Sequence, residues 1–143
     1  MTEKRNLLVA VDGSKKSYDA FLEALKYSEA QITLLYVIDQ SLPNDQEFYL
    51  SPQYQILPEN NAFEPFAENY LNRLASSAGV EHNIQKVTME GNASKCIVQY
   101  AEENPIDLII LGKTGKGTVE RMILGSTSHY VLKHASCNVL VVN

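Results

Sequence analysis

The sequence predicts a single α/β domain built on a five-stranded parallel sheet with helices on both faces. Short apolar runs alternate along the chain with segments whose apolar residues have helical spacing. Four of the apolar runs are almost continuous, which is typical of strands buried on both faces of a parallel sheet. The length of 143 residues suits one domain, spanning residues 1–143, with a single well-buried core.

The strands are expected where the apolar runs lie. The four buried ones are residues 6–11 (NLLVAV), 31–38 (QITLLYVI), 107–112 (DLIILG) and 138–142 (NVLVV). A fifth, residues 83–89 (NIQKVTM), mixes polar and apolar residues and suits an edge of the sheet. With right-handed crossovers between consecutive strands, the predicted strand order is 3-2-1-4-5.

Helices are expected between the strands. In the first, Tyr18, Phe21, Leu22 and Leu25 have the i, i+3, i+4, i+7 spacing of a buried stripe. The second carries a longer stripe that Gly79 closes. The third is expected to begin after a cap at Asn92 and to end at about Glu103, before Pro105. The fourth follows Ser126, with Tyr130, Val131 and either Ala135 or Leu132 on its buried side.

Composition and charge exclude several classes of protein. A net charge of −5 and a pI near 5.1 argue against a general nucleic-acid binder or a binder of anionic membranes. No apolar run approaches transmembrane length and the N-terminus lacks a cleavage-type site, so neither a signal peptide nor a membrane span is expected. Cys96 and Cys137 form no CxxC pair and are expected to be reduced core thiols of a cytoplasmic protein.

The predicted topology also predicts where a ligand binds. The strand order reverses between the first and fourth strands, and ligands of such sheets bind at the carboxyl ends of the strands that flank the reversal. Those ends carry VDGS (11–14) and LGKTGKG (111–117). Residues 39–62 are long and irregular and leave the second strand near the same edge, so they could form a lid or a disordered loop.

The glycines of residues 111–117 do not match the P-loop pattern. A Walker A loop requires glycine, four residues, and then Gly-Lys-Ser/Thr. For Gly112–Thr114 the first glycine would have to be residue 107, which is Asp107. Counting from Gly112 instead, Gly117 is followed by Thr118 where lysine is required. A GxGxxG pattern fails as well, because Glu120 stands at its third glycine.

A different spacing does fit: Gly112, two residues, Gly115, nine residues, then Gly125 and Ser126. Glycines at the first two positions let the backbone turn sharply and approach a ligand closely. Ser126 and Thr127 lie where a helix is expected to begin, so main-chain N–H groups and hydroxyls there suit an anion. The alternative is a flexible loop followed by an ordinary serine N-cap.

Three segments resemble the universal stress protein family: LLVAVDGS (7–14), EGNASKCIVQYAEENPIDLIILGKTGKG (90–117) and LGSTSHYVLKHASCNVLVV (124–142). The resemblance covers nearly the whole chain except residues 39–62. It implies a Rossmann-like fold of the adenine-nucleotide alpha hydrolase type. In that family the G-2x-G-9x-G-S/T pattern distinguishes the members that bind ATP, so it also implies ATP, with Mg²⁺ held mainly through the phosphates.

The resemblance further implies roles for single residues. Asp12 is expected near the ribose and phosphates, and Val37 is expected to meet adenine through its backbone. Met89 and Gly91 match the region that walls the base. The remaining candidate positions, expected around ribose and phosphates, are Val11, Gly112, Thr114, Gly115, Gly125, Ser126 and Thr127. Lys113 stands where the family usually has a small residue, and Thr114 where arginine or histidine is common. The lysine could add phosphate affinity or point to solvent.

Asp12 has a second reading, since an aspartate before Gly-Ser commonly makes a turn and caps the following helix. It could also help to hold Mg²⁺ on the phosphates, and the two roles are compatible. His82, His129 and His134 form no metal-ligand motif, and no Ser-His-Asp or Cys-His set has recognisable spacing. A dedicated catalyst is therefore disfavoured.

The last strand, residues 138–142, is apolar and is expected at an edge, where exposed strands need cover. Pairing with a second copy would cover it and resembles the dimer contact common in the family. The expected function is that of an ATP-binding stress-response protein whose nucleotide occupancy modulates contacts within a homodimer or with an unknown protein partner. The alternatives are an enzyme that slowly hydrolyses ATP or transfers its phosphate, and a nucleotide-free interaction module.

Overall fold

The chain folds around one parallel sheet whose strand order, β3-β2-β1-β4-β5, confirms the prediction. The computed structural model describes residues 4–39, 63–113 and 124–143. The strands are β1 (Arg5–Val11), β2 (Ala30–Ile38), β3 (Asn83–Glu90), β4 (Leu108–Gly112) and β5 (Asn138–Val142). Each differs from its expected range by at most one residue at either end.

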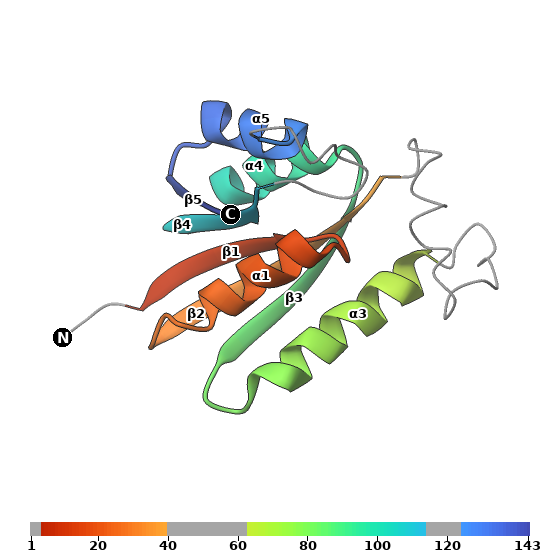
Figure 1. Ribbon diagram of the computed structural model, residues 1–143, viewed down its shortest axis with the longest axis vertical. Helices are drawn as coiled ribbons and strands as arrows, with labels where there is room; N and C mark the ends of the chain where they lie inside the picture. The colour runs from red at the N-terminus through yellow and green to blue at the C-terminus, as the bar shows by residue number, and fades with distance from the viewer. Residues whose placement is uncertain (1–3, 40–62, 114–123) are drawn as a thin grey trace.

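Helices cover both faces of the sheet. They are α1 (Lys15–Ala24), α3 (Phe63–Ala78), α4 (Ala93–Glu103) and α5 (Ser126–His134). Figure 1 shows α1 and α3 on one face and α4 and α5 on the other. Each pair closes its own apolar core, one containing Phe21 and Leu71, the other Ile97 and Val131. This three-layer arrangement is the fold class that the sequence predicts.

The centre of the sheet is its most buried part. Leu7, Leu8 and Val9 of β1 are fully buried, because β1 pairs with β2 on one side and β4 on the other. β3 pairs with β2, and β5 pairs with β4, so these two strands form the edges as expected.

Local sequence fixes the helix ends. The Ser14 side chain caps α1 by accepting from the Ser17 amide at 3.2 Å, and the Asn92 side chain caps α4 by accepting from the Lys95 amide at 3.1 Å. Caps of this kind satisfy amides that have no partner within the helix. α3 ends before Gly79, whose φ of +90° lies in the region that favours glycine. The caps at Asn92 and Gly79 confirm the prediction.

The buried side of α1 was predicted only in part: Phe21 is buried and Leu25 packs on the core as expected, but the other two positions are wrong. Tyr18 and Leu22 are each 40% exposed, whereas the side facing the sheet consists of Ser17, Ala20, Phe21 and Ala24. Small residues lie there because α1 approaches the end of β4 closely. In α5 Val131 is buried as expected; Leu132 is 43% exposed, and Ala135 rather than Leu132 packs on the core.

None of the helices in the described part of the chain combines the length and the hydropathy needed to cross a membrane.

Candidate functional site

A cavity of about 80 Å³ lies at the carboxyl ends of the central strands, where the strand order reverses. Its volume is several times the roughly 10–15 Å³ that one water molecule requires. Its lining comes from three strands and three helices: Ala10, Val11, Asp12, Ser17, Leu35, Val37, Ala93, Ile97, Leu111, Gly112, Thr127 and Ser128. The cavity is therefore where the topology predicts a ligand site.

The lining has an apolar part and a polar part. Aliphatic side chains come from β1, β2, β4 and α4, and the polar ones are Asp12, Ser17, Thr127 and Ser128. An apolar wall with a few convergent polar groups is the usual composition of a small-molecule site.

The turn after β1 holds Asp12 in place. The Ser14 amide donates to Asp12 Oδ1 at 2.9 Å, and Gly13 between them has a φ of +87°. The Ser17 hydroxyl donates to the Ser14 carbonyl at 3.0 Å and accepts from the Asp12 amide at 3.2 Å. The expected turn role of Asp12 is confirmed, and its carboxylate lies where a chain turn meets the cavity.

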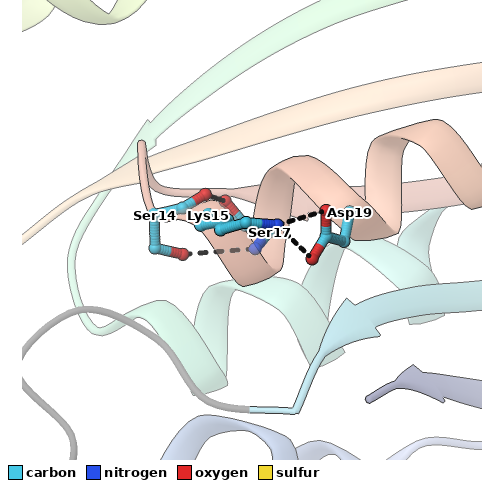
Figure 2. Close-up of polar contacts among 4 residues, drawn as sticks. All are labelled: Ser14, Lys15, Ser17 and Asp19. Carbon is cyan, nitrogen blue, oxygen red and sulfur yellow. Dashed lines mark hydrogen bonds and ion pairs between the residues drawn. The ribbon is translucent and has the colours of Figure 1, made fainter.

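Figure 2 shows how Ser14 and Ser17 are linked in the first turn of α1. On the outer side of the same turn, Lys15 Nζ reaches Asp19 at 3.3 Å. The lysine side chain is 85% exposed, so this ion pair lies in solvent and adds little to stability. The serine contacts, not the ion pair, shape the cavity wall.

A second set of contacts ties β4 to α5 and β5. The Lys113 amide donates to the Val142 carbonyl at 2.8 Å, and the Gly125 amide donates to the Lys113 carbonyl at 2.9 Å. The Ser128 hydroxyl donates to the Gly112 carbonyl at 2.8 Å, and the Lys113 carbonyl lies 3.3 Å from it. Gly112 and the first turn of α5 are thereby held together at the cavity.

The N-terminus of α5 differs from those of α1 and α4. Its N-cap is Gly125, with no side-chain cap, whereas its first turn lacks an acidic residue just as theirs do. The interpretation of Ser126 as an N-cap is therefore wrong, because Ser126 is already the first helical residue and its side chain is exposed. First-turn amides without a side-chain acceptor are donors for an anion.

Gly112 has a reason to be glycine besides ligand access. A β-carbon at Gly112 would lie 2.6 Å from the carbonyl carbon of Lys16 and 2.7 Å from its oxygen. The close approach that the glycine permits is that of α1 to β4, while its other side lines the cavity.

The residues expected to bind the base lie on β2 and at the end of β3. Val37 is half-buried and lines the cavity. Met89 is its register partner on β3, one strand further from β1, and packs with it on the same core. Gly91, with a φ of +138°, donates from its amide to the Ile38 carbonyl at 3.0 Å. Met89 and Gly91 lie beside the cavity without lining it.

Five of the predicted site residues line the cavity: Val11, Asp12, Val37, Gly112 and Thr127. Gly125 and Ser126 lie next to it at the start of α5. Thr114 and Gly115 lie outside the described residues. Sequence reasoning missed Ser17 and Ser128, because serine within a helical segment normally indicates an exposed position. Their spacing from the cap residues, three positions after Ser14 and after Gly125, was the available signal.

Cys96 lies on α4 next to the cavity residue Ile97, and its Sγ would be 3.2 Å from a β-carbon at Gly91. Burial raises the pKa of the Cys96 thiol, and the negative charge of Asp39 raises it further. Burial also raises the pKa of Cys137, with a smaller contribution from Asp107. Both cysteines are free; Cys96 is buried and Cys137 half-buried, which places the first of them in the core as expected.

Known proteins share both sequence and fold with this chain over almost its entire length. The universal stress protein UspA of Lactobacillus plantarum is 32% identical, covers 100% of both chains and superposes with a TM-score of 0.73. A universal stress protein in complex with cAMP has 21% identity, covering 99% of this chain and 98% of its own, with a TM-score of 0.67. A universal stress protein family protein from Arabidopsis thaliana with AMP bound has 19% identity, coverage of 96% and 90%, and a TM-score of 0.63.

The sequence model of the universal stress protein family matches residues 4–143, which includes every element of the sheet and both walls of the cavity. The chain belongs to the universal stress protein family.

Proposed function

We propose that this chain binds an adenine nucleotide, ATP in the first place, in the cavity at the ends of β1, β2 and β4, and that occupancy regulates its contacts with a second copy or another protein. The observation that carries the proposal is the position of the α5 N-terminus: a helix start without a side-chain cap adjoins a largely apolar cavity. Two relatives of the same fold have cAMP and AMP bound.

The apolar part of the cavity suits the base. The Ile38 carbonyl accepts from the amide of Gly91, which follows the last residue of β3, so the main-chain groups of Ile38 face β3. Main-chain groups of successive strand residues point to alternate sides, so those of Val37 face β1. The last residue of β1, Val11, pairs with Tyr36, so the Val37 carbonyl lies one residue beyond the end of the pairing with β1. A carbonyl there is an acceptor for the exocyclic amino group of adenine, with Leu35, Ala93 and Ile97 as apolar surroundings.

The other part of the cavity suits ribose and phosphates. The Thr127 side chain and the first-turn amides of α5 are donors at one wall, and the Asp12 carboxylate lies at another. We place Mg²⁺ on the phosphates of ATP, with Asp12 as its nearest protein oxygen. Thr114 and Gly115, which the family resemblance assigns to this part of the site, would add to these groups.

Binding rather than turnover is the function that these groups favour. Among the described residues that line the cavity, Asp12 alone carries a side chain suited to acid–base chemistry. Its Oδ1 accepts from the Ser14 amide, so the carboxylate is part of a structural turn. A hydrolase would need a base and a positioned water.

Thermal unfolding of nucleotide-stripped protein with AMP, cAMP, ATP and Mg²⁺-ATP tests the proposal. A nucleotide at 100 times its dissociation constant should stabilise the native state by about 2.7 kcal/mol. Ala93→Leu extends a side chain into the cavity and should abolish the shift. The control is Gln99→Leu on the same helix, an exposed residue bonded to Glu103. If no nucleotide shifts the wild-type transition, the proposal is wrong. Consumption of ATP in the same samples would favour an enzyme instead.

The second part of the proposal concerns assembly. β5 pairs with β4 on one side and forms an edge of the sheet. Two helices that contact β5 carry exposed apolar side chains, Tyr18 and Leu22 on α1 and Leu132 on α5. An apolar edge strand is stabilised by pairing, and we propose a homodimer through β5.

A further inference from the structure

One buried hydroxyl joins two walls of the cavity. Ser128 is 3% exposed and belongs to the first turn of α5. Its Oγ donates to the Gly112 carbonyl at 2.8 Å, with the Lys113 carbonyl at 3.3 Å. Ser128 and Gly112 both line the cavity. The contact therefore spans from α5 to the end of β4, between residues 16 positions apart in the sequence.

Among the described hydrogen bonds between α5 and the end of β4, those of Ser128 are made by a side chain. The neighbouring bonds, from the Gly125 amide to Lys113 and from the Lys113 amide to Val142, join main-chain atoms. Any residue at those positions except proline can make them. The Ser128 bond requires a hydroxyl, and the α5 N-cap offers no side chain of its own.

We propose that Ser128 is a positioning residue for the phosphate end of the bound nucleotide, acting by fixing the first-turn amides of α5 against β4. This inference rests on the proposed function. A helix N-terminus stabilises an anion only when its amides point at the ligand, and the effect falls off within one turn. Loss of the hydroxyl lets the first turn of α5 move relative to Gly112 and weakens the hold on the phosphate.

The inference predicts discrimination between two ligands that share the same base and sugar. Adenosine does not need the α5 amides, whereas AMP places a phosphate among them. Loss of the Ser128 hydroxyl should therefore weaken AMP binding by about ten-fold, the effect of one lost hydrogen bond, and leave adenosine binding unchanged. A merely structural role would lower the affinity for both ligands together.

The test uses Ser128→Thr and Ser128→Val. The two new side chains have the same shape, but threonine has a hydroxyl where valine has a methyl group. Titration calorimetry with AMP and with adenosine measures both affinities in each variant and in the wild type. The threonine variant should match the wild-type preference for AMP over adenosine, and the valine variant should lose it. Ser77→Ala is the control, because its hydroxyl donates to the Leu74 carbonyl at 2.7 Å near the end of α3. It should leave both affinities unchanged.

The outcomes separate the two proposals. If the wild-type chain binds none of adenosine, AMP and ATP, the proposed function itself is wrong. If the wild type binds AMP and the two Ser128 variants keep equal preferences, the site stands and the role of Ser128 is overturned. Equal losses for both ligands in the valine variant also overturn it, because they show a general effect on the fold.

Discussion

Gly112 at the end of β4 lies against the backbone of Lys16 in α1, so closely that a β-carbon on Gly112 would be 2.6 Å from the Lys16 carbonyl carbon. The two nearest atoms are main-chain atoms and the third is the Lys16 β-carbon, none of which can move aside as the end of a side chain can. The same close approach accounts for the small residues, Ser17, Ala20 and Ala24, on the sheet side of α1. One glycine thus sets both the distance of a helix from the sheet and one wall of the cavity.

Gly112→Ala should lower the free energy of unfolding by about 1–3 kcal/mol, the usual cost of forcing extra volume into a packed site. Urea denaturation followed by circular dichroism measures the change. Lys16→Ala in the same chain should not restore stability, because it keeps the Lys16 main chain and β-carbon, the atoms that a β-carbon on Gly112 would meet. Recovery in the double variant would show that the Lys16 side chain is the obstacle and would contradict this account.

The sheet could be predicted from the sequence because its signal is local. Continuous apolar runs such as residues 138–142 and the helix cap at Asn92 each depend on a few neighbouring residues, and all were found in place. The buried side of α1 could be predicted in this way only for Phe21 and Leu25. The apolar period selects Tyr18 and Leu22, but close packing against Gly112 requires small residues instead. That requirement depends on a strand about 90 positions later in the chain.

The candidate site was predictable in its place and less so in its composition. The strand reversal and the glycine spacing both indicate the carboxyl ends of β1 and β4, where the cavity lies. Ser17 and Ser128 were missed because a serine hydroxyl acquires its role only from the carbonyl that it meets after folding. For Ser128 this is Gly112 on another element. Met89 was placed in the site by resemblance and lies beside it, because β3 is separated from β1 by β2.

Asp12→Ala should destabilise the protein by about 1 kcal/mol, because the Ser14 amide loses its acceptor at the start of α1. Asp12→Asn keeps an amide oxygen in the same position and should lose less than half as much. Thermal and urea unfolding of the two variants measure the difference. Equal losses would show that the negative charge near the α1 N-terminus matters and that the turn acceptor does not.

The asparagine variant also tests the metal role that we propose for Asp12. If the carboxylate holds Mg²⁺ on the phosphates, Asp12→Asn should reduce the advantage of Mg²⁺-ATP over metal-free ATP while leaving AMP binding unchanged. Titrations with and without Mg²⁺ provide the comparison. An unaltered advantage would assign Asp12 to the turn alone.

The two cysteines should make stability fall at alkaline pH. Burial raises the pKa of Cys96 and Cys137 in the folded state. When the pKa of a thiol is higher in the folded state than in the unfolded state, the thiol makes its full contribution to the free energy of unfolding at any pH below the unfolded pKa. This contribution is lost as the pH rises through the folded pKa, because the thiol loses its proton at a lower pH in the unfolded chain than in the folded one. Cys96→Ala with Cys137→Ala should flatten this decline. The measurement is the free energy of unfolding from neutral to alkaline pH, where an equal slope in both proteins would refute the assignment.

The edge of β5 that faces away from β4 can be altered without breaking the hydrogen bonds between β5 and β4. Val142 accepts from the Lys113 amide, so its main-chain groups face β4, and those of Val141 face the open edge. Proline lacks an amide hydrogen and is tolerated in sheets on the solvent side of an edge strand. Val141→Pro therefore removes a donor that a second copy would need, while the bonds between β4 and β5 remain.

Light scattering after gel filtration should then find a dimer for the wild type and a monomer for Val141→Pro. Val141→Thr, which keeps both the amide and the branched side chain, should remain dimeric. Retained nucleotide-induced stabilisation in the monomer would show that the proline left the cavity intact, since Gly112 and Lys113 connect the two regions through β5. A wild-type monomer at every concentration would rule out the paired edge. A dimer that persists in the proline variant would place the interface elsewhere.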